Sequence, residues 1–265
     1  MRPEAIVREM RHDDEYFVAT CSHTFESAEI DEAAAKRGEL LDALRHTGAR
    51  FKVALQDREP VGFIHGIPIE ASSWGPIGEG LLVVPCLYVL PQAAGANLGR
   101  RLLDAIVADA KREGRGGVVV TAYTGTTSET FMPAAYFSRQ GFEEVEARGQ
   151  AMLLWMRLHD HAAPPRLLEP HYVYRPDPER VAVDLFWNGF CQTSAIEARR
   201  VREVVAEFGQ GVVLREFCAE DRDTLKRYQI PRAIFVNGEE VFWGHEAPKV
   251  GVRKAIEKAR EAMRR

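Results

Sequence analysis

The sequence has few cysteines and no long apolar run. Its 265 residues include four cysteines, which are far apart and form no CxxC pair. Neither a disulfide framework nor a zinc site is therefore predicted, and reduced thiols are expected. No apolar stretch approaches the roughly 18 residues that a membrane helix needs, and the start of the chain, MRPEAIVREM, lacks the apolar core of a signal peptide. We therefore expect a cytoplasmic protein that does not bind membranes.

The sequence also lacks an excess of basic charge. Its formal net charge is −4 at pH 7, and residues of both signs occur along the whole chain. A nucleic-acid surface needs a concentrated positive potential, so we expect no nucleic-acid partner. The hydrophobic share of 46% is normal for a globular protein, and the length allows one large domain or two ordinary ones.

A proline-rich stretch divides the chain. HDHAAPPRLLEPHYVYRPDPER, residues 159–180, contains five prolines and no apolar periodicity, which is typical of an extended connection. We predict a first domain over residues 1–158, a linker over 159–178 and a second domain over 179–265. The linker also contains three histidines: His159, His161 and His171. Their irregular spacing and the missing fourth ligand favour solvated side chains over a metal site, so no metal is predicted.

The first domain has the pattern of a mixed α/β sheet with helices on both faces. The expected order is a strand at 5–10, helices near 14–25 and 29–48, strands at 50–70 around a polar turn, a strand at 80–90, a helix at 98–112, a strand at 116–124, a short helix near 133–141 and two strands at 142–158. The stretch GLLVVPCLYVL, residues 80–90, is almost wholly apolar, as in a central strand covered on both faces. Pro85 within it is a candidate bulge that turns the strand away from its neighbour.

After this strand, the chain passes through a loop of small residues into an amphipathic helix. Helix 98–112 has apolar residues at helical spacing, so it is expected to pack on the sheet. Its free N–H groups and its dipole favour a phosphate at the N-terminus. Gly95 and Gly99 allow close approach of the backbone, and Asn97 tolerates a left-handed conformation. The loop alone is equally compatible with an ordinary strand-to-helix connection.

The spacing of residues in this stretch matches a known pattern without gaps. The matching positions are Val89, Pro91, Gly95, Leu98, Gly99, Leu102 and Leu103. This spacing resembles the acetyl-CoA loop of GNAT acyltransferases, V-x-P-x-x-R-G-x-G-I-G-x-x-L-L, and PAAYFSRQGF, residues 133–142, resembles a later signature of that family. The resemblance implies a GNAT-like fold and binding of acetyl-CoA or another acyl-CoA. It assigns the cofactor to Leu87, Tyr88, Val89, Ala94, Gly95, Ala96, Asn97, Leu98, Gly99 and Arg100.

Three positions depart from the family's pattern. The usual Arg or Gln at the loop start is Ala94, and one loop glycine is Asn97. Main-chain N–H groups supply most of the pyrophosphate contacts, so we expect Ala94 to weaken binding without abolishing it. The family's general-acid tyrosine falls on Phe137. Tyr136 is adjacent, but neighbouring helical residues point about 100° apart, so we expect water, or Tyr136 after a local rearrangement, to protonate the leaving thiolate.

Two residues are candidates for the general base that deprotonates the amine. His65 lies on the strand before the central one and Glu70 lies at the exit of that strand, and their odd and even positions put only one of them on a given face. A solvated or hydrogen-bonded strand residue is the structural alternative for each. Tyr88 and Tyr123 are candidate acids for which core packing is the alternative, and Cys86 is expected to be a small buried hydrophobe.

The second domain has the order βαβαββα, with an Asn-Gly hairpin before the last helix. FWNGFCQTS places Cys191 at a strand-to-helix turn, and YQIPRAIF places Pro231 before the third strand. Both features resemble thioredoxin-like domains, where a cysteine attacks and a cis-proline faces it, so a cis Ile230–Pro231 bond is expected. Ser194 stands in the usual place of the resolving cysteine, and Cys218 is a distant candidate partner.

The reactivity of this thiol is a second expectation. A helix N-terminus favours the thiolate, so Cys191 should react faster than Cys86. A mixed disulfide at Cys191 and a binding module without a redox role are equally compatible with the CxxS motif.

The chain as a whole resembles the YoaP-type family, in which a GNAT domain is followed by a small C-terminal domain. The resemblance rests on the stretches VGFIHGIPIE and VVPCLYVLP and on the redox-like second domain. The sequence therefore predicts an N-acetyltransferase for a small-molecule or protein amine, with an appended monothiol thioredoxin-like domain, and it is compatible with a homodimer. The alternative is a thiol-redox or binding protein in which the GNAT domain holds CoA as a sensor or scaffold. A third interpretation is an assembly in which both units only bind.

Overall fold

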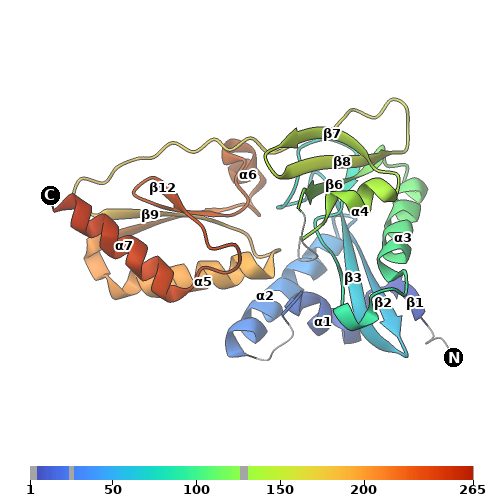
Figure 1. Ribbon diagram of the computed structural model, residues 1–265, viewed down its shortest axis with the longest axis horizontal. Helices are drawn as coiled ribbons and strands as arrows, with labels where there is room; N and C mark the ends of the chain where they lie inside the picture. The colour runs from blue at the N-terminus through green and yellow to red at the C-terminus, as the bar shows by residue number, and fades with distance from the viewer. Residues whose placement is uncertain (1–4, 24–26, 126–130, 265) are drawn as a thin grey trace. The chain divides into compact units, whose positions relative to one another are not determined.

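The computed structural model describes most of the chain: residues 5–23, 27–125 and 131–264. Its contacts divide the chain into two compact units, which Figure 1 shows as ribbons. Unit 1 comprises Met1–Thr24 and Gly38–Leu168, and unit 2 comprises Phe25–Arg37 and Glu169–Arg265. On the N-terminal side, the boundary falls inside one helix, α2 (Ala28–Arg45).

Unit 1 contains a large mixed sheet with the strand order β1-β2-β3-β4-β6-β8-β7, and β5 pairs with β3 outside this path. The strands are β1 (Ala5–Glu9), β2 (Arg50–Gln56), β3 (Glu59–Pro68), β4 (Leu81–Val83), β5 (Leu87–Val89), β6 (Gly117–Tyr123), β7 (Glu143–Arg148) and β8 (Ala151–Arg157). The pair β4–β6 is parallel, and the other neighbours are antiparallel. The predicted mixed sheet is confirmed.

Helices cover both faces of this sheet because successive residues of a strand point to opposite faces. On one face, α3 (Leu98–Arg112) and α4 (Ala134–Arg139) bury their apolar sides together with Ile64. On the other face, Phe17 of α1 (Glu15–Thr20) lies edge-on to Phe63, with ring centroids 6.0 Å apart. The second half of α2 contributes to the same face, where the Arg45 guanidinium lies over the Phe51 ring.

Several predicted elements agree with the structure and two differ. The helix at 98–112 has the expected bounds, and the turn between β2 and β3 contains two residues with positive φ, Asp57 and Arg58. The apolar stretch 80–90 is two short strands rather than one, because the backbone around Pro85 leaves the ladder. The helix expected near 14–25 ends at Thr20, and positions 24 and 25 of that prediction lie outside the described residues.

Unit 2 is a four-stranded sheet with the order β10-β9-β11-β12. Its elements are β9 (Val181–Trp187), α5 (Gln192–Glu207), a short 3-10 turn at Gly209–Gly211, β10 (Val212–Cys218), α6 (Arg222–Tyr228), β11 (Ala233–Val236), β12 (Glu239–Val241) and α7 (Lys249–Met263). Unit 1 has short 3-10 turns at His12–Asp14 and Pro91–Ala93. Strands β9 and β10 are parallel, whereas β11 is antiparallel to β9 and β12 to β11. The hairpin turn has positive φ at Asn237 and Gly238, as the sequence predicts.

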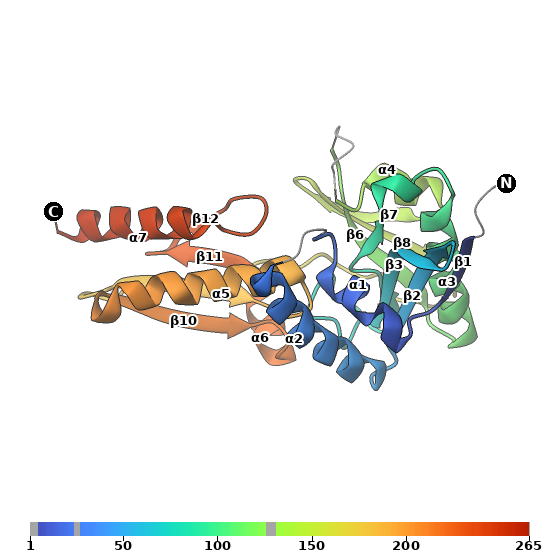
Figure 2. The same cartoon turned by 90° about the horizontal axis from the view of Figure 1, so that it is seen from below.

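The two faces of this smaller sheet bury different side chains. Helices α5 and α7 pack on one face against Val181, Val183 and Leu185 (Figures 1 and 2). The other face is aromatic and is built around Phe186 and Phe235. The alternation of β9 therefore separates an aliphatic core from an aromatic one.

The proline-rich stretch has no helix or regular strand, and its side chains are anchored at two places. Leu167 is 6% exposed and belongs to an apolar cluster of unit 1. Tyr172 stacks on Phe235 with ring centroids 3.9 Å apart, and its hydroxyl donates to Asp184 Oδ2 at 2.7 Å. Burial and the hydrogen bond to this carboxylate raise the pKa of Tyr172.

The expected cis bond between Ile230 and Pro231 is wrong, because every peptide bond in the described residues is trans. The chain instead reverses at Gln229, which closes α6 in the left-handed region with φ of +52°. Because the left-handed conformation at Gln229 already changes the chain direction, the bond before Pro231 can remain trans, and proline restricts only its own φ.

Candidate functional site

A split between neighbouring strands forms the centre of the candidate site in unit 1. Strand β4 pairs with β6 through Val83 and Val119, and the Val84 N–H still donates to the Val119 carbonyl at 2.8 Å. Beyond this point β6 continues to Tyr123 and pairs with β8, while β5 pairs with β3 in the described part of the sheet. The two central strands therefore part at the bulge that contains Pro85, as the sequence predicts.

The backbone of β5 presents amide groups toward this split. The Cys86 carbonyl accepts from the His65 N–H at 3.1 Å, and the Leu90 N–H donates to Val61 at 2.8 Å, so residues 86, 88 and 90 turn their polar groups to β3. Because these groups alternate along an antiparallel strand, Leu87 and Val89 turn theirs to the opposite side. A ligand in the split can therefore pair with the main chain of β5.

The loop after β5 leaves the start of α3 bare. Gly95 has φ of +84°, and Asn97, the N-cap of α3, has φ of +59° and makes no capping hydrogen bond through its side chain. The first N–H groups of a helix have no partner within the helix. The first turn has no acidic residue, and Arg100 and Arg101 lie in it. Main-chain N–H groups, the helix dipole and two cations thus favour an anion at this position.

Tyr136 of α4 reaches this helix start. Its hydroxyl oxygen lies 3.0 Å from the position that a Cβ atom on Gly99 would take. This oxygen is buried and has no hydrogen-bond partner among the described residues, and burial raises the pKa of Tyr136 to about 12. Phe137, at the position where the resemblance predicts a tyrosine, is fully buried in the core beside α3. Tyr136 is therefore a protonated donor next to the predicted cofactor loop.

The two candidate bases lie in different surroundings. His65 is fully buried, stacks on Phe63 at 5.0 Å and lies edge-on to Phe51 at 5.3 Å. Glu70 is exposed in the turn after β3, and its Oε1 accepts from the Gly80 N–H at 2.6 Å. The structure thus gives His65 an aromatic packing role and gives Glu70 a role in holding a loop. The catalytic assignment of either residue remains a prediction.

The other candidate side chains of unit 1 are partly or fully buried. Tyr88 packs near Phe63, with centroids 5.9 Å apart, and burial raises its pKa. Cys86 is 5% exposed, in agreement with the expected small hydrophobe. Tyr123 on β6 lies 6.5 Å from the Phe131 ring. Cys86 is therefore a buried core residue, whereas Tyr88 and Tyr123 keep some exposed surface.

In unit 2, Asn188 joins the two features that the sequence singles out. Its Oδ1 accepts from the Cys191 N–H at 2.9 Å, and its Nδ2 donates to the Pro231 carbonyl at 2.8 Å. Cys191 is the N-cap of α5 and is partly exposed, and none of the four cysteines forms a disulfide. Ser194 is buried, and its hydroxyl accepts from the Asn188 N–H at 3.0 Å. The serine of the CxxS motif therefore stabilises the turn.

Sequence reasoning missed a cation near this thiol. Arg232 interacts electrostatically with Cys191, and its Nε donates to Glu197 Oε2 at 2.6 Å. Burial is the largest single influence on the pKa of Arg232 and lowers it, but the hydrogen bond and the attraction to Glu197, together with smaller attractions to other groups, raise this pKa overall. Arg232 directly follows Pro231 in YQIPRAIF. Because this stretch was expected to face Cys191, its arginine was a signal in the sequence that could have predicted the nearby cation.

Comparison with known families agrees with the geometry of unit 1. Residues 47–144 match the family model described as an acetyltransferase (GNAT) domain. The matched segment is similar to that family, in agreement with the expected resemblance, and it contains the β4–β5 bulge, the loop and α3. No curated protein matches the chain.

Solved structures of acetyltransferases are similar to part of the chain at low identity. A GNAT family acetyltransferase from Brucella melitensis in complex with acetyl-CoA is 22% identical, with a TM-score of 0.39, over 62% of this chain and 96% of the other. A ribosomal-protein-alanine N-acetyltransferase from the same organism is 20% identical, with a TM-score of 0.44, over 58% and 99%. The PaiA N-acetyltransferase from Thermoplasma acidophilum, in complex with coenzyme A, is 15% identical, with a TM-score of 0.41, over 58% and 99%.

The described parts of the chain contain neither a cluster of metal ligands nor a membrane-spanning helix. No group of three or more His, Cys, Asp or Glu side chains there is arranged to hold a metal ion, and the linker residues His159 and His161 stack on each other at 5.6 Å. No helix in those parts is long and apolar enough to cross a membrane.

Proposed function

We propose that unit 1 is an N-acetyltransferase that transfers an acyl group from acetyl-CoA, or another acyl-CoA, to a small-molecule or protein amine. The observation that carries this proposal is the split between β5 and β6 beside the bare start of α3. A long ligand with a phosphate at one end and a thioester at the other fits this combination of an anion site and an open strand edge. The family match over residues 47–144 supports the same reaction.

Different residues of unit 1 bind the cofactor, polarise the thioester and transfer protons in the proposed reaction. The N–H groups from Gly95 to Arg100 hold the pyrophosphate, and the two arginines after Gly99 add positive charge. The amide groups of Leu87 and Val89 align the pantetheine and polarise the thioester carbonyl, which makes it a better target for the amine. Tyr136 is protonated at neutral pH, so its hydroxyl, which has no partner among the described residues, can donate a hydrogen bond to the bound cofactor. A base takes the proton of the amine, and Glu70 and His65 are the candidates.

Turnover against a panel of amines tests this proposal. The full chain is incubated with acetyl-CoA and each amine, and release of the CoA thiol is followed. We expect thiol release that depends on the amine and persists in the Cys191→Ser variant, because Cys191 belongs to unit 2. Binding of acetyl-CoA without turnover on any amine would favour the sensor or scaffold alternative, and absence of binding would contradict the proposal.

A second candidate function belongs to unit 2. We propose that it is a thioredoxin-like domain with a reactive monothiol at Cys191, which makes the chain similar to the YoaP-type family. The strand order β10-β9-β11-β12 and the position of Cys191 at the start of α5 support this proposal. Incubation with glutathione disulfide tests it: the Cys191 thiolate would displace one glutathione thiolate and form a mixed disulfide detectable by mass. A folded protein that stays unmodified would contradict it.

A further inference from the structure

The beginning of α2 is packed on α5 within unit 2. We call residues 27–37 the docking segment: it comprises the first ten residues of α2 and Ser27 before them, whose hydroxyl accepts from the Ile30 N–H at 3.2 Å. Ile30 and Ala33 form a small cluster with Ile196 of α5. These apolar side chains are 2%, 8% and 1% exposed, respectively. The apolar contact is therefore tight and small.

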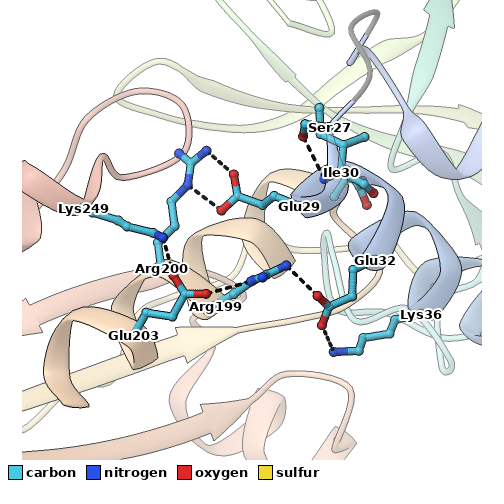
Figure 3. A network of polar contacts seen from close by, with 10 residues as sticks. Ser27, Glu29, Ile30, Glu32, Lys36, Arg199, Arg200, Glu203 and Lys249 are labelled. Atoms are coloured by element: carbon cyan, nitrogen blue, oxygen red, sulfur yellow. Dashed lines mark hydrogen bonds and ion pairs between the residues drawn. The ribbon is translucent and has the colours of Figure 1, made fainter. Parts of the chain in front are cut away.

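Charged pairs surround this cluster. Glu29 forms a two-pronged pair with Arg200, at 2.9 Å to Nε and 2.6 Å to Nη2, and Glu32 accepts from Arg199 Nη1 at 2.6 Å (Figure 3). The acidic residues come from the docking segment and the arginines from α5. This arrangement of two carboxylates against two arginines fixes the orientation of the docking segment on α5.

The basic side of the contact is itself held in place. Glu203 accepts from Arg199 Nε at 2.9 Å and pairs with Lys249 of α7, as the dashed lines in Figure 3 show. These pairs lower the pKa of Glu203, so it is ionised at neutral pH. Arg199 is therefore also oriented by a carboxylate outside the docking segment.

The docking segment also touches the residues on both sides of Cys191. Gln192 donates through Nε2 to the Ile30 carbonyl at 3.0 Å and is 1% exposed. The Arg37 guanidinium lies 5.5 Å from the centre of the Phe190 ring, and both side chains are buried. The neighbours of Cys191 are thus covered by α2, while the cysteine keeps partial exposure.

The packing beside the ion pairs is incomplete. An open cavity of about 440 Å³ is lined by Glu29, Arg199, Arg200, Pro248 and Lys249. The Arg199 and Glu32 side chains are 37% and 49% exposed, so salt screens their attraction. A small apolar cluster with partly exposed charges holds a helix less firmly than a large apolar interface does.

We propose that the side of α5 that carries Arg199 and Arg200 is a docking surface for a helix with carboxylates at matching positions, that residues 27–37 are its intramolecular occupant, and that their release increases access to Cys191. The occupant is this segment because its Glu29 and Glu32 pair with Arg200 and Arg199 of α5, and the Ile30 carbonyl accepts from Gln192. The inference concerns access to the thiol and holds whether or not Cys191 has a catalytic role. Charge reversal at one pair weakens docking, and exchange of the two charges restores it.

The experiment uses the full chain and four variants: Glu29→Arg, Arg200→Glu, the double exchange Glu29→Arg with Arg200→Glu, and the control Arg253→Glu. The control removes a matched pair of α5 and α7, Arg253 with Glu207, in which both distances are 2.8 Å. The rate of iodoacetamide labelling at Cys191 is measured by mass spectrometry. Amide hydrogen exchange of residues 28–37 is measured on the same samples.

We expect each single reversal to raise both rates at least about threefold, a range that partly exposed ion pairs can produce. The double exchange should return both rates to near the wild-type values, and the control should leave both unchanged. In the wild type, both rates should rise between about 0.05 M and about 1 M salt. Unchanged exchange in the single reversals would overturn the docking surface. Faster exchange with unchanged labelling, or no labelling in any variant, would overturn the shielding of Cys191.

Discussion

The hydroxyl of Tyr136 fills the space that a side chain on Gly99 would occupy, at 3.0 Å from the missing Cβ position. Gly99 is in the first turn of α3, and Tyr136 is in α4. The absence of a side chain at position 99 therefore serves two purposes. It leaves the helix start open to a phosphate, and it allows a tyrosine hydroxyl to approach that helix.

Replacement of Gly99 by valine should weaken CoA binding at least tenfold, or about 1.4 kcal/mol. There are two structural causes: the valine side chain displaces the Tyr136 hydroxyl, and it shifts the first turn of α3. A double-mutant cycle separates these causes. Gly99→Ala should cost less affinity in a Tyr136→Phe background, where the contacting oxygen is absent. Unchanged affinity in a folded Gly99→Val protein would contradict the placement of the pyrophosphate.

Replacement of Tyr136 by phenylalanine should reduce kcat less than about tenfold. Its hydroxyl is at the helix start that we assign to the pyrophosphate, so it is a binding group and not the acid that protonates the leaving thiolate. Steady-state kinetics with the best amine measure this effect. A fall of about 10²-fold or more in kcat would identify Tyr136 as the acid after all.

Tyr136 should also contribute to alkaline unfolding. Its pKa is about 12 in the folded protein, above the value of about 10 in an unfolded chain. The stability that its neutral form contributes is therefore complete below pH 10 and is lost as the pH rises toward 12. Denaturant unfolding at pH 9 and pH 11 should show a smaller loss of stability in Tyr136→Phe than in the wild type. An equal loss in both proteins would contradict the raised pKa.

The sequence predicted elements that depend on local patterns. Helix 98–112 follows from apolar spacing, and the hairpin at Asn237-Gly238 follows from turn residues that adopt positive φ. The split of the central strand followed from Pro85, since proline cannot donate to a ladder. The packing of residues 27–37 within unit 2 was not predictable, because the partners are about 160 positions away and exposed charges carry no pattern of their own.

The candidate sites show the same limit. The spacing from Val89 to Leu103 located the loop, but burial of His65 between two aromatic rings needed the strand register that pairs it with Phe51. The cation near Cys191 also comes from a distant part of the chain, at Arg232. The cis bond expected before this arginine was wrong, since a hallmark inferred from a resemblance does not fix backbone geometry.

His65 and Glu70 should respond differently to substitution. His65→Phe is expected to lower thermal stability and to change kcat less than about threefold, because the buried ring packs against Phe63 and Phe51. Glu70→Gln keeps an oxygen that accepts from Gly80 but removes a base. A fall in kcat of about 10²-fold with a normal melting temperature would assign Glu70 as the base. The same result for His65→Phe would contradict its packing role.

Cys191 should be alkylated before Cys86 at neutral pH. Cys191 is partly exposed at the start of α5 with Arg232 near it, whereas Cys86 is 5% exposed within the sheet. Brief iodoacetamide treatment followed by peptide mass spectrometry compares the two sites. Cys191→Ser is the control for peptide assignment. Labelling of Cys86 first in a folded protein would contradict this order.

Isothermal titration of the full chain with acetyl-CoA tests the central claim most directly. The split between β5 and β6 and the bare start of α3 form one site in unit 1, so we expect saturable binding of one ligand per chain, with Kd below about 100 µM. Gly99→Val should weaken this binding, and Cys191→Ser should leave it unchanged. A folded protein that produces no binding heat with acetyl-CoA or CoA at any temperature tested would contradict the assignment of unit 1 as an acyl-CoA-dependent acetyltransferase.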